Sequence, residues 1–145
     1  MKNNKISIVS GGFDPLHVGH IELFEKAREI SDNLLVILNT DDFLLDKKGK
    51  VFMPFDERQK ILESLKPVDL VVPSIDNDET VCATLEKLSE IREEVDAELY
   101  FCNGGDRTSG EDTPEHKTCE YLNIKTVYGL GKKIQSSSWL TEDYE

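Results

Sequence analysis

Five short apolar runs alternate with longer amphipathic segments along the 145 residues of the chain. Apolar residues follow one another in the runs, which predicts strands that are buried on both faces. The segments between them carry apolar residues at helical spacing. This alternation predicts a three-layer α/β domain of Rossmann type, spanning residues 1–145, with a five-stranded parallel sheet between helices. The predicted strands are 6–10, 34–39, 69–73, 98–102 and 124–128, and the predicted helices are 18–30, 56–65, 80–94 and 114–122.

Polar residues and proline at the segment boundaries predict where several helices begin. Asp56 is the expected N-cap of the second predicted helix, and Pro114 is expected in the first turn of the fourth. Three consecutive serines, Ser136 to Ser138, predict the start of a final helix. Residues 40–59 (TDDFLLDKKGKVFMPFDERQ) read as a loop in their middle.

The predicted topology indicates where a ligand would bind. In parallel α/β sheets, ligands bind beyond the carboxyl ends of the strands. This rule brings polar and glycine-bearing segments together along one edge of the sheet, and we expect the functional site there. The segments are 11–20, 39–50, 73–78, 103–107 and 129–138.

Composition narrows the function classes. The net charge of −12 argues against a nonspecific nucleic-acid or membrane-surface binder, so any anionic ligand needs a local positive site. The three cysteines, Cys82, Cys102 and Cys119, lack C-x-x-C spacing, which indicates reduced thiols. The apolar stretch near the N-terminus is too short for a signal peptide or a membrane span. The expected location is therefore the cytoplasm.

The stretch GGFDPLHVGH, residues 11–20, combines two glycines with a histidine pair where the first strand ends. Free N–H groups and the dipole at a helix start favour an anion. His17 and His20 lie three residues apart, which places them on one helix face. Helical zinc pairs usually use a spacing of four, and no third ligand is evident, so no protein metal site is predicted. The glycines do not form G-x-G-x-x-G, and the residues alone leave a phosphate site and surface histidines as open alternatives.

The same stretch resembles the G-x-F-D-x-x-H-x-G-H motif of the nucleotidyltransferase superfamily, with every fixed position filled. That superfamily includes cytidylyltransferases for glycerol phosphate, phosphocholine and phosphoethanolamine, and adenylyltransferases for heptose phosphate, pantetheine phosphate and nicotinate mononucleotide. Residues 39–73 resemble the second block of the glycerol-phosphate cytidylyltransferases. NGGDR, residues 103–107, resembles the Gly-Gly-Asp of heptose-phosphate adenylyltransferases, and QSSSWL, residues 135–140, stands where the family has a Ser-Thr-Thr helix start.

The resemblance implies a role for each matching position. His17 and His20 are expected to stabilise charge on the triphosphate, and a loop lysine is expected to clamp the α-phosphate. The Lys-Gly pattern favours Lys48, counting from Asp41 favours Lys47, and Lys50 could assist. The expected nucleotide contacts are Gly11, Gly12, Phe13, Gly19, Gly105, Asp106, Gln135, Ser136, Ser137 and Ser138. The expected acceptor contacts are Asp14, Asp41, Arg58, Lys66, Asp69 and Arg107.

Several of these positions have simpler interpretations. Phe13 can be core packing, Asp14 can hold the turn, and Asp69 can be a structural cap. Arg58 and Lys66 can be ordinary surface charges on or near a helix. Near the chain end the glycerol-phosphate relatives have an arginine that is missing here, so Lys132 or Lys133 must replace it if the charge is needed.

The resemblance implies transfer of CMP from CTP to a phosphorylated small alcohol, polyol or sugar, with release of pyrophosphate. Mg²⁺ is expected, held mainly by nucleotide phosphates, and a homodimer is expected because relatives are commonly dimers. One alternative is an adenylyltransferase that uses ATP on a sugar phosphate. Another, of a different class, is a nucleotide-binding module without turnover. An oxidoreductase of the Rossmann dinucleotide type lacks its glycine fingerprint here.

Overall fold

The computed structural model describes residues 4–76, 80–104 and 113–130 and contains the predicted parallel sheet. The strands lie in the order β3-β2-β1-β4-β5, and every neighbouring pair is parallel. This order confirms the predicted Rossmann-like α/β fold. The strands are β1 (Asn4–Gly11), β2 (Asn33–Leu38), β3 (Leu70–Pro73), β4 (Ala97–Gly104) and β5 (Lys125–Leu130).

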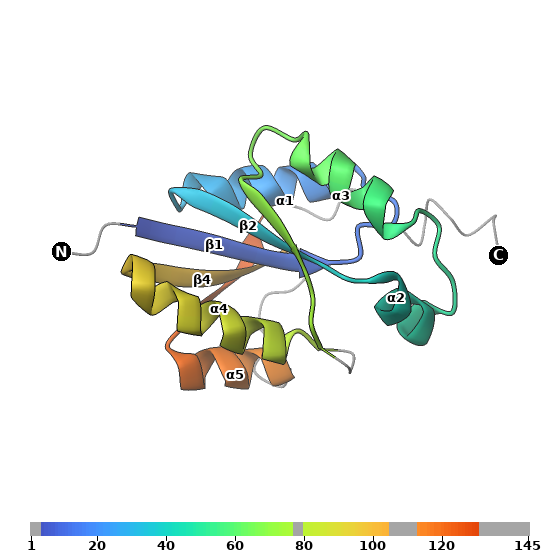
Figure 1. The fold of residues 1–145 in the computed structure, drawn as a ribbon. Coiled ribbons are helices and arrows are strands. Elements are labelled where there is room, and N and C mark those ends of the chain that lie inside the picture. Colours follow the sequence, from blue (N-terminus) through green and yellow to red (C-terminus); the bar gives the residue numbers. More distant parts are fainter. Residues whose placement is uncertain (1–3, 77–79, 105–112, 131–145) are drawn as a thin grey trace.

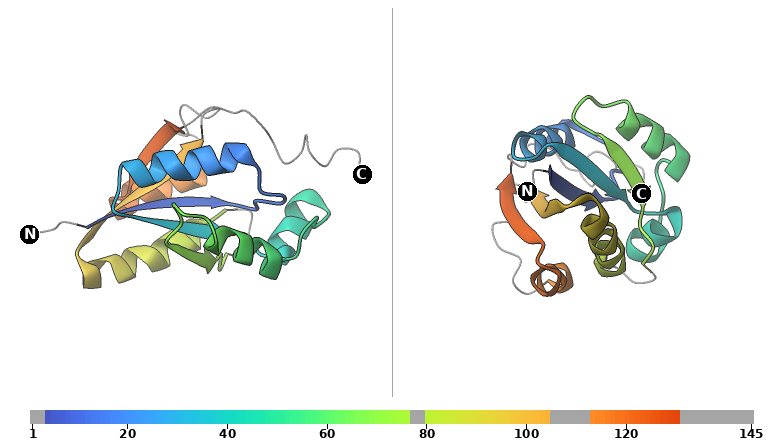
Figure 2. Two further views of the ribbon diagram at one scale, coloured as in Figure 1. Left: turned by 90° about the horizontal axis from the view of Figure 1, so that it is seen from above. Right: turned by 60° about the vertical axis from the view of Figure 1, so that its left-hand side comes forward.

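Helices cover both faces of the sheet, and one short helix lies beyond the carboxyl ends of the strands (Figures 1 and 2). One face carries α1 (Val18–Glu29) and α3 (Phe55–Glu63), and the other carries α4 (Cys82–Val95) and α5 (Pro114–Leu122). The short helix is α2 (Asp41–Lys48), which follows β2 directly. Among the described ranges, no helix has both the length and the apolar character that crossing a bilayer requires.

The apolar strands divide their side chains between two cores because successive residues of a strand point to opposite faces. Val9 belongs to the core beneath α1 and α3, together with Phe13, Phe24 and Leu62. Its neighbour Ile8 belongs to the core beneath α4 and α5. The continuous apolar runs of the sequence thus serve both layers of helices at once.

Helix α2 corrects the sequence-based prediction of a loop over this segment. Its N-cap is Thr40, whose hydroxyl accepts a hydrogen bond from the Phe43 N–H at 3.1 Å. It ends at Gly49, which adopts a left-handed conformation with φ of 81°. Apart from Phe43 and Leu44, the helix buries no residue, so its apolar periodicity was too weak to detect.

The start of α3 also differs from the prediction. The N-cap is Pro54, and Asp56 lies inside the first turn, where its charge complements the helix dipole. Pro114 does occupy the start of α5, behind Thr113 as N-cap, as predicted. The predicted final helix lies outside the described residues.

Candidate functional site

His17 and His20 cap the helix that carries them. The Nδ1 atom of His17, the N-cap of α1, accepts a hydrogen bond from the Gly19 N–H at 3.1 Å. The Nδ1 atom of His20 accepts one from the His17 N–H at 3.2 Å. This reciprocal arrangement is a capping box in which histidines replace the usual hydroxyl and carboxyl residues. The two rings stack with centroids 3.6 Å apart.

These bonds define the chemistry that the histidine pair offers. Burial and, to a lesser extent, the charges of His17 and Lys48 together lower the pKa of His20 to about 3. Burial also lowers the pKa of His17. Both rings are therefore neutral at pH 7, and because each Nδ1 is an acceptor, each proton is on Nε2. The pair thus presents two Nε2–H donors, which suits the oxygens of a phosphate.

The residues before the histidines hold them in place. Phe13 is buried, and its ring meets the His20 ring edge-on with centroids 4.8 Å apart. A Cβ at Gly11 would lie 2.9 Å from the Phe13 ring, and one at Gly12 would lie 2.7 Å from Leu44. Both distances are shorter than real Cβ contacts. The glycines therefore allow close approach of protein side chains, in addition to any approach of a nucleotide.

Arg58 joins the motif to its surroundings from a fully buried position. Its guanidinium donates to the carbonyls of Gly12, Asn39 and Met53, each at 2.8 Å, and to the Asp41 carboxylate at 2.6 Å. Burial contradicts the alternative interpretation of Arg58 as an ordinary surface charge. These four bonds give Arg58 a structural role, which differs from the predicted contact with an acceptor phosphate.

Asp14 is also buried, and its contacts match the interpretation of a residue that holds the turn. One carboxylate oxygen accepts from the Phe52 N–H and the other from the Met53 N–H, both at 2.6 Å. The carboxylate thereby ties the motif loop to the segment before α3. Asp41, the first residue of α2, lies at the same edge through its ion pair with Arg58.

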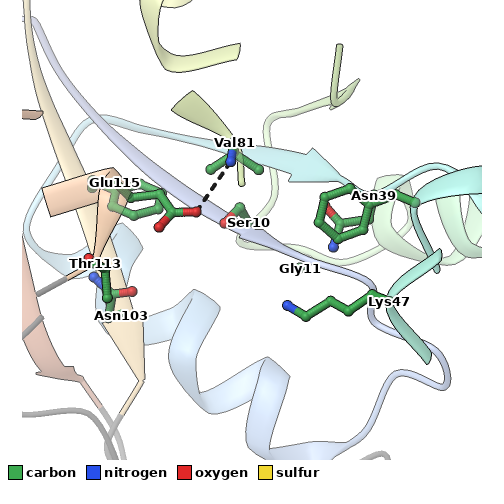
Figure 3. Close-up of a pocket in the computed structure, with 10 residues that line it drawn as sticks. Ser10, Gly11, Asn39, Lys47, Val81, Asn103, Thr113 and Glu115 are labelled. Carbon is green, nitrogen blue, oxygen red and sulfur yellow. Dashed lines mark hydrogen bonds between the residues drawn. The ribbon is translucent and has the colours of Figure 1, made fainter. Parts of the chain in front are cut away.

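The loop lysines point to two different parts of the site. Lys47 lines a pocket at the carboxyl edge of the sheet, and its ammonium end reaches across that pocket from α2 (Figure 3). The charge of Lys48 contributes to the lowered pKa of His20, which indicates that Lys48 lies near the histidine pair. The structure therefore places one lysine at the pocket and the other near the histidine pair, whereas the sequence left a choice between the two.

The pocket has a volume of about 260 Å³ and lies on the α4 and α5 side of the sheet edge. Lys47 enters from one side, and Glu115 from α5 lies on the opposite side (Figure 3). One oxygen of Glu115 accepts a hydrogen bond from the Val81 N–H, at the N-cap of α4, at 3.2 Å. The lining residues are Ser10, Gly11, Asn39, Phe43, Lys47, Val81, Phe101, Asn103, Thr113 and Glu115.

Strand alternation explains the polar floor of this pocket. Ile8, Ile37 and Phe101 are core residues of adjacent strands on the α4 and α5 side. Ser10, Asn39 and Asn103 each follow one of them by two positions and so face the same way. This period of two was a usable signal that the sequence analysis missed. No such periodicity marks Glu115 and Thr113 as pocket residues, because their position depends on how α5 packs against α4.

Two predicted acceptor residues lie away from this edge. The chain turns from α3 into β3 at Lys66, at the amino ends of the strands, and Lys66 is exposed there. Asp69 lies at the same end, where its carboxylate accepts from the Leu34 N–H at 2.8 Å and pairs with Arg28 at 3.0 Å. Both residues thus lie at the end of the parallel sheet opposite the pocket, and the contacts of Asp69 match its interpretation as a structural cap.

The remaining predicted residues divide into two groups. Gly19 is described, and its N–H is already used by His17. Asp76, from the polar segment 73–78 that was expected at this edge, caps α4 through the N–H groups of Ala83 at 2.7 Å and Thr84 at 3.1 Å. The others lie outside the described residues: Gly105, Asp106, Arg107, Lys132, Lys133, Gln135, Ser136, Ser137 and Ser138.

A doubly covered parallel sheet with a histidine pair beyond β1 is the arrangement that the resemblance implied. The model of the cytidylyltransferase-like family matches residues 8–136. The chain therefore belongs to the cytidylyltransferase-like family of nucleotidyltransferases. This membership confirms the resemblance that the motif indicated.

Individual relatives agree with this membership. The chain is 47% identical over 66 residues to glycerol-3-phosphate cytidylyltransferase of Staphylococcus aureus (strain NCTC 8325 / PS 47). This match covers 46% of this chain and 50% of that protein. The chain thus spans about half the length of that relative. It is 30% identical over 123 residues to glycerol-3-phosphate cytidylyltransferase of Bacillus spizizenii (strain ATCC 23059 / NRRL B-14472 / W23), covering 85% of this chain and 88% of that protein.

A solved structure shares the fold. It is the lipopolysaccharide core biosynthesis protein of Thermoplasma volcanium GSS1, with a TM-score of 0.65 and 23% identity. The match covers 89% of this chain and 98% of that one. At this identity the likeness concerns the fold alone.

Proposed function

We propose that this protein transfers CMP from CTP to a small phosphorylated alcohol, polyol or sugar and releases pyrophosphate. The proposal rests on the histidine pair, which offers two neutral Nε2–H donors at the start of α1. Family membership supports the reaction class. The names of the two relatives support CTP as the nucleotide and a phosphorylated polyol as the acceptor.

The chemistry needs positioning and charge stabilisation more than a protein nucleophile. An oxygen of the acceptor phosphate attacks the α-phosphorus of CTP and forms a new P–O bond. The bond from that phosphorus to the oxygen bridging to the β-phosphate breaks, and pyrophosphate leaves on the opposite side. His17 and His20 donate Nε2–H bonds to phosphate oxygens that gain charge. Lys47 and Lys48 supply positive charge against the acidic background of the chain.

Mg²⁺ neutralises triphosphate charge when it is bound. Among the described residues, no group of three histidine, cysteine or acidic side chains could hold a metal ion. We expect the ion to arrive on the phosphate oxygens of the nucleotide. Cytoplasmic location and a homodimer remain part of the proposal. The nucleotide contacts that the resemblance implies for Gly105, Ser136, Ser137 and Ser138 also remain part of the proposal.

The first test is a screen for pyrophosphate release with CTP or ATP, Mg²⁺ and a panel of phosphorylated alcohols, sugars and amino alcohols. We expect turnover with CTP and a phosphorylated polyol. Preference for ATP would support the adenylyltransferase alternative. Turnover with none of the panel would contradict the proposal and favour the binding module.

The second test separates the two roles of His17. Asparagine is a good N-cap, so His17→Asn keeps the helix start but removes the Nε2–H donor. We expect pyrophosphate release to fall by about 100-fold or more, with the thermal midpoint nearly unchanged. His116→Asn is a matched control, since His116 contacts Tyr128 in β5 and Glu120 in α5 and lies outside the pocket lining. Near-normal turnover of His17→Asn would contradict the proposed role.

A further inference from the structure

We propose that the pocket on the α4 and α5 side holds the phosphorylated acceptor, and that Glu115 selects acceptors with a hydroxyl-bearing carbon chain. This inference rests on the proposed function and deepens it by naming the acceptor class and the residue that recognises it. Glu115 belongs to none of the motif blocks that carry the family resemblance. Its position against the pocket comes from the packing of α5 against α4.

The location follows from the geometry of the displacement. Nucleophile and leaving group lie on opposite sides of the phosphorus in an in-line transfer. The histidine pair that is proposed to meet the leaving pyrophosphate packs on Phe13, a member of the core under α1 and α3. Val81 and Phe101, which line the pocket, belong to the core under α4 and α5. The pocket is thus on the opposite side of the sheet edge, where the acceptor must approach.

The charges in the pocket indicate how the acceptor is oriented. Lys47 is a cation at one side, suited to the phosphate of the acceptor. Glu115 lies across from it and needs hydrogen-bond donors (Figure 3). An acceptor with its phosphate toward Lys47 therefore places its distal groups against Glu115. The volume of about 260 Å³ is below the roughly 300–1,000 Å³ of pockets for drug-sized ligands, so it suits a small molecule.

The uncharged lining favours hydroxyl groups at that distal end. Ser10, Asn103 and Thr113 line the pocket and can each donate or accept a hydrogen bond. The Oδ1 atom of Asn39 is buried and has no hydrogen-bond partner among the described residues. Such an acceptor atom is destabilising unless a donor reaches it, and a ligand hydroxyl supplies one. A quaternary ammonium at that end would be attracted by the Glu115 charge but has no hydrogen-bond donor to offer Glu115 or the Asn39 Oδ1 atom.

The structural contact of Glu115 allows a clean variant. One oxygen of Glu115 accepts from the Val81 N–H, and the amide oxygen of a glutamine can make the same bond. Glu115→Gln therefore keeps the cap of α4 but removes the charge and turns the second oxygen into a donor. A purely structural role of Glu115 would survive this change, whereas recognition of an acceptor hydroxyl would not. Glu120→Gln on the same helix is the matched control, because Glu120 is exposed and pairs with His116.

The experiment measures kcat and KM for pyrophosphate release with CTP. The acceptors are sn-glycerol 3-phosphate, erythritol 4-phosphate and ribitol 5-phosphate, their alkyl counterparts propyl, butyl and pentyl phosphate, and phosphocholine. We expect the wild-type protein to use at least one hydroxylated acceptor with kcat/KM about 100-fold above its alkyl counterpart. Glu115→Gln should raise the KM for that acceptor by about tenfold. The KM for CTP and the thermal midpoint should stay near wild-type values, and Glu120→Gln should change none of them.

The outcomes distinguish this inference from the proposed function. Absence of pyrophosphate release by the wild-type protein with every acceptor contradicts the proposed function itself. If turnover occurs, three results overturn the inference alone. They are a preference for phosphocholine, equal use of alkyl and hydroxylated phosphates, and a Glu115→Gln variant whose acceptor KM is unchanged or whose two KM values rise together.

Discussion

At the scale of single residues, the histidine pair works through neutral rings. Two imidazolium ions with ring centroids 3.6 Å apart would repel each other, and burial of His20 adds to the cost of charging it. The lowered pKa values avoid that repulsion at pH 7 and leave each Nε2 protonated. The site thus provides hydrogen-bond donors whose number does not change over the physiological pH range.

The low pKa of His20 predicts a pH dependence of stability. The folded-state pKa of about 3 is below the unfolded value of 6.5, so the unfolded chain binds the extra proton first as pH falls. Stability from this group is complete above pH 6.5 and is lost between 6.5 and about 3. Glutamine suits the third position of a capping box, so His20→Gln keeps the cap without titrating.

Urea unfolding at several pH values tests this. Below pH 6.5 the free energy of unfolding of the wild-type protein should fall more steeply than that of His20→Gln, by up to about 1.4 kcal/mol per pH unit. Above pH 7 the two curves should run parallel. Parallel curves down to pH 4 would show that His20 does not titrate between the folded and unfolded states as described.

At the scale of elements, Arg58 connects three segments that are distant in sequence. From α3 it reaches the glycine turn after β1, the end of β2 and the start of α2. Each bond supplies a hydrogen-bond donor to a carbonyl or carboxylate oxygen, which the surrounding apolar side chains cannot do. The position of α2, and with it the position of Lys47, therefore depends on one buried guanidinium.

Removing that group should be costly. Arg58→Met leaves the carbonyls of Gly12, Asn39 and Met53 without their donor, so we expect the free energy of unfolding to fall by about 3 kcal/mol or more. Lys60→Met, an exposed cation on the same helix, should change it by less than about 0.5 kcal/mol. Equal effects of the two substitutions in urea unfolding would rule out the structural role of Arg58.

At the scale of the whole molecule, the sheet separates two cores, and each contains a buried thiol. Burial raises the pKa of Cys102 to about 11, in the core beneath α1 and α3. Burial raises the pKa of Cys119 to about 12, in the core beneath α4 and α5. Cys82, at the start of α4, is partly exposed. Thiol chemistry therefore reports whether each core is closed.

Labelling with 5,5′-dithiobis(2-nitrobenzoate) at pH 8 tests that arrangement. The native protein should react quickly at Cys82 alone, and a Cys82→Ser variant should show no fast reaction. Cys102 and Cys119 should become reactive together as urea unfolds the chain, since both cores share the same sheet. Fast reaction of either thiol in the native Cys82→Ser protein would mean that its core opens by itself.

The sequence predicted the sheet well because its signals are local. Consecutive apolar residues mark each strand, and glycine, proline and capping residues mark the ends. Helix α2 escaped prediction because Phe43 and Leu44 alone are buried in it. Arg58, Lys66 and Asp69 were assigned to the acceptor by family position, but burial and strand direction decide which side chains can reach the site.

Taken alone, the sequence determined the α/β class and the strands, and it predicted a candidate site at the edge beyond β1 with the histidine pair. These follow from periodicities and motifs that neighbouring residues carry. The tertiary structure alone decided that the histidines cap their own helix, that Lys47 and Lys48 lie toward different parts of the site, and that Glu115 faces Lys47 across a pocket. Those facts depend on contacts between residues far apart in the chain, because packing places α2 and α5 beside the strand ends.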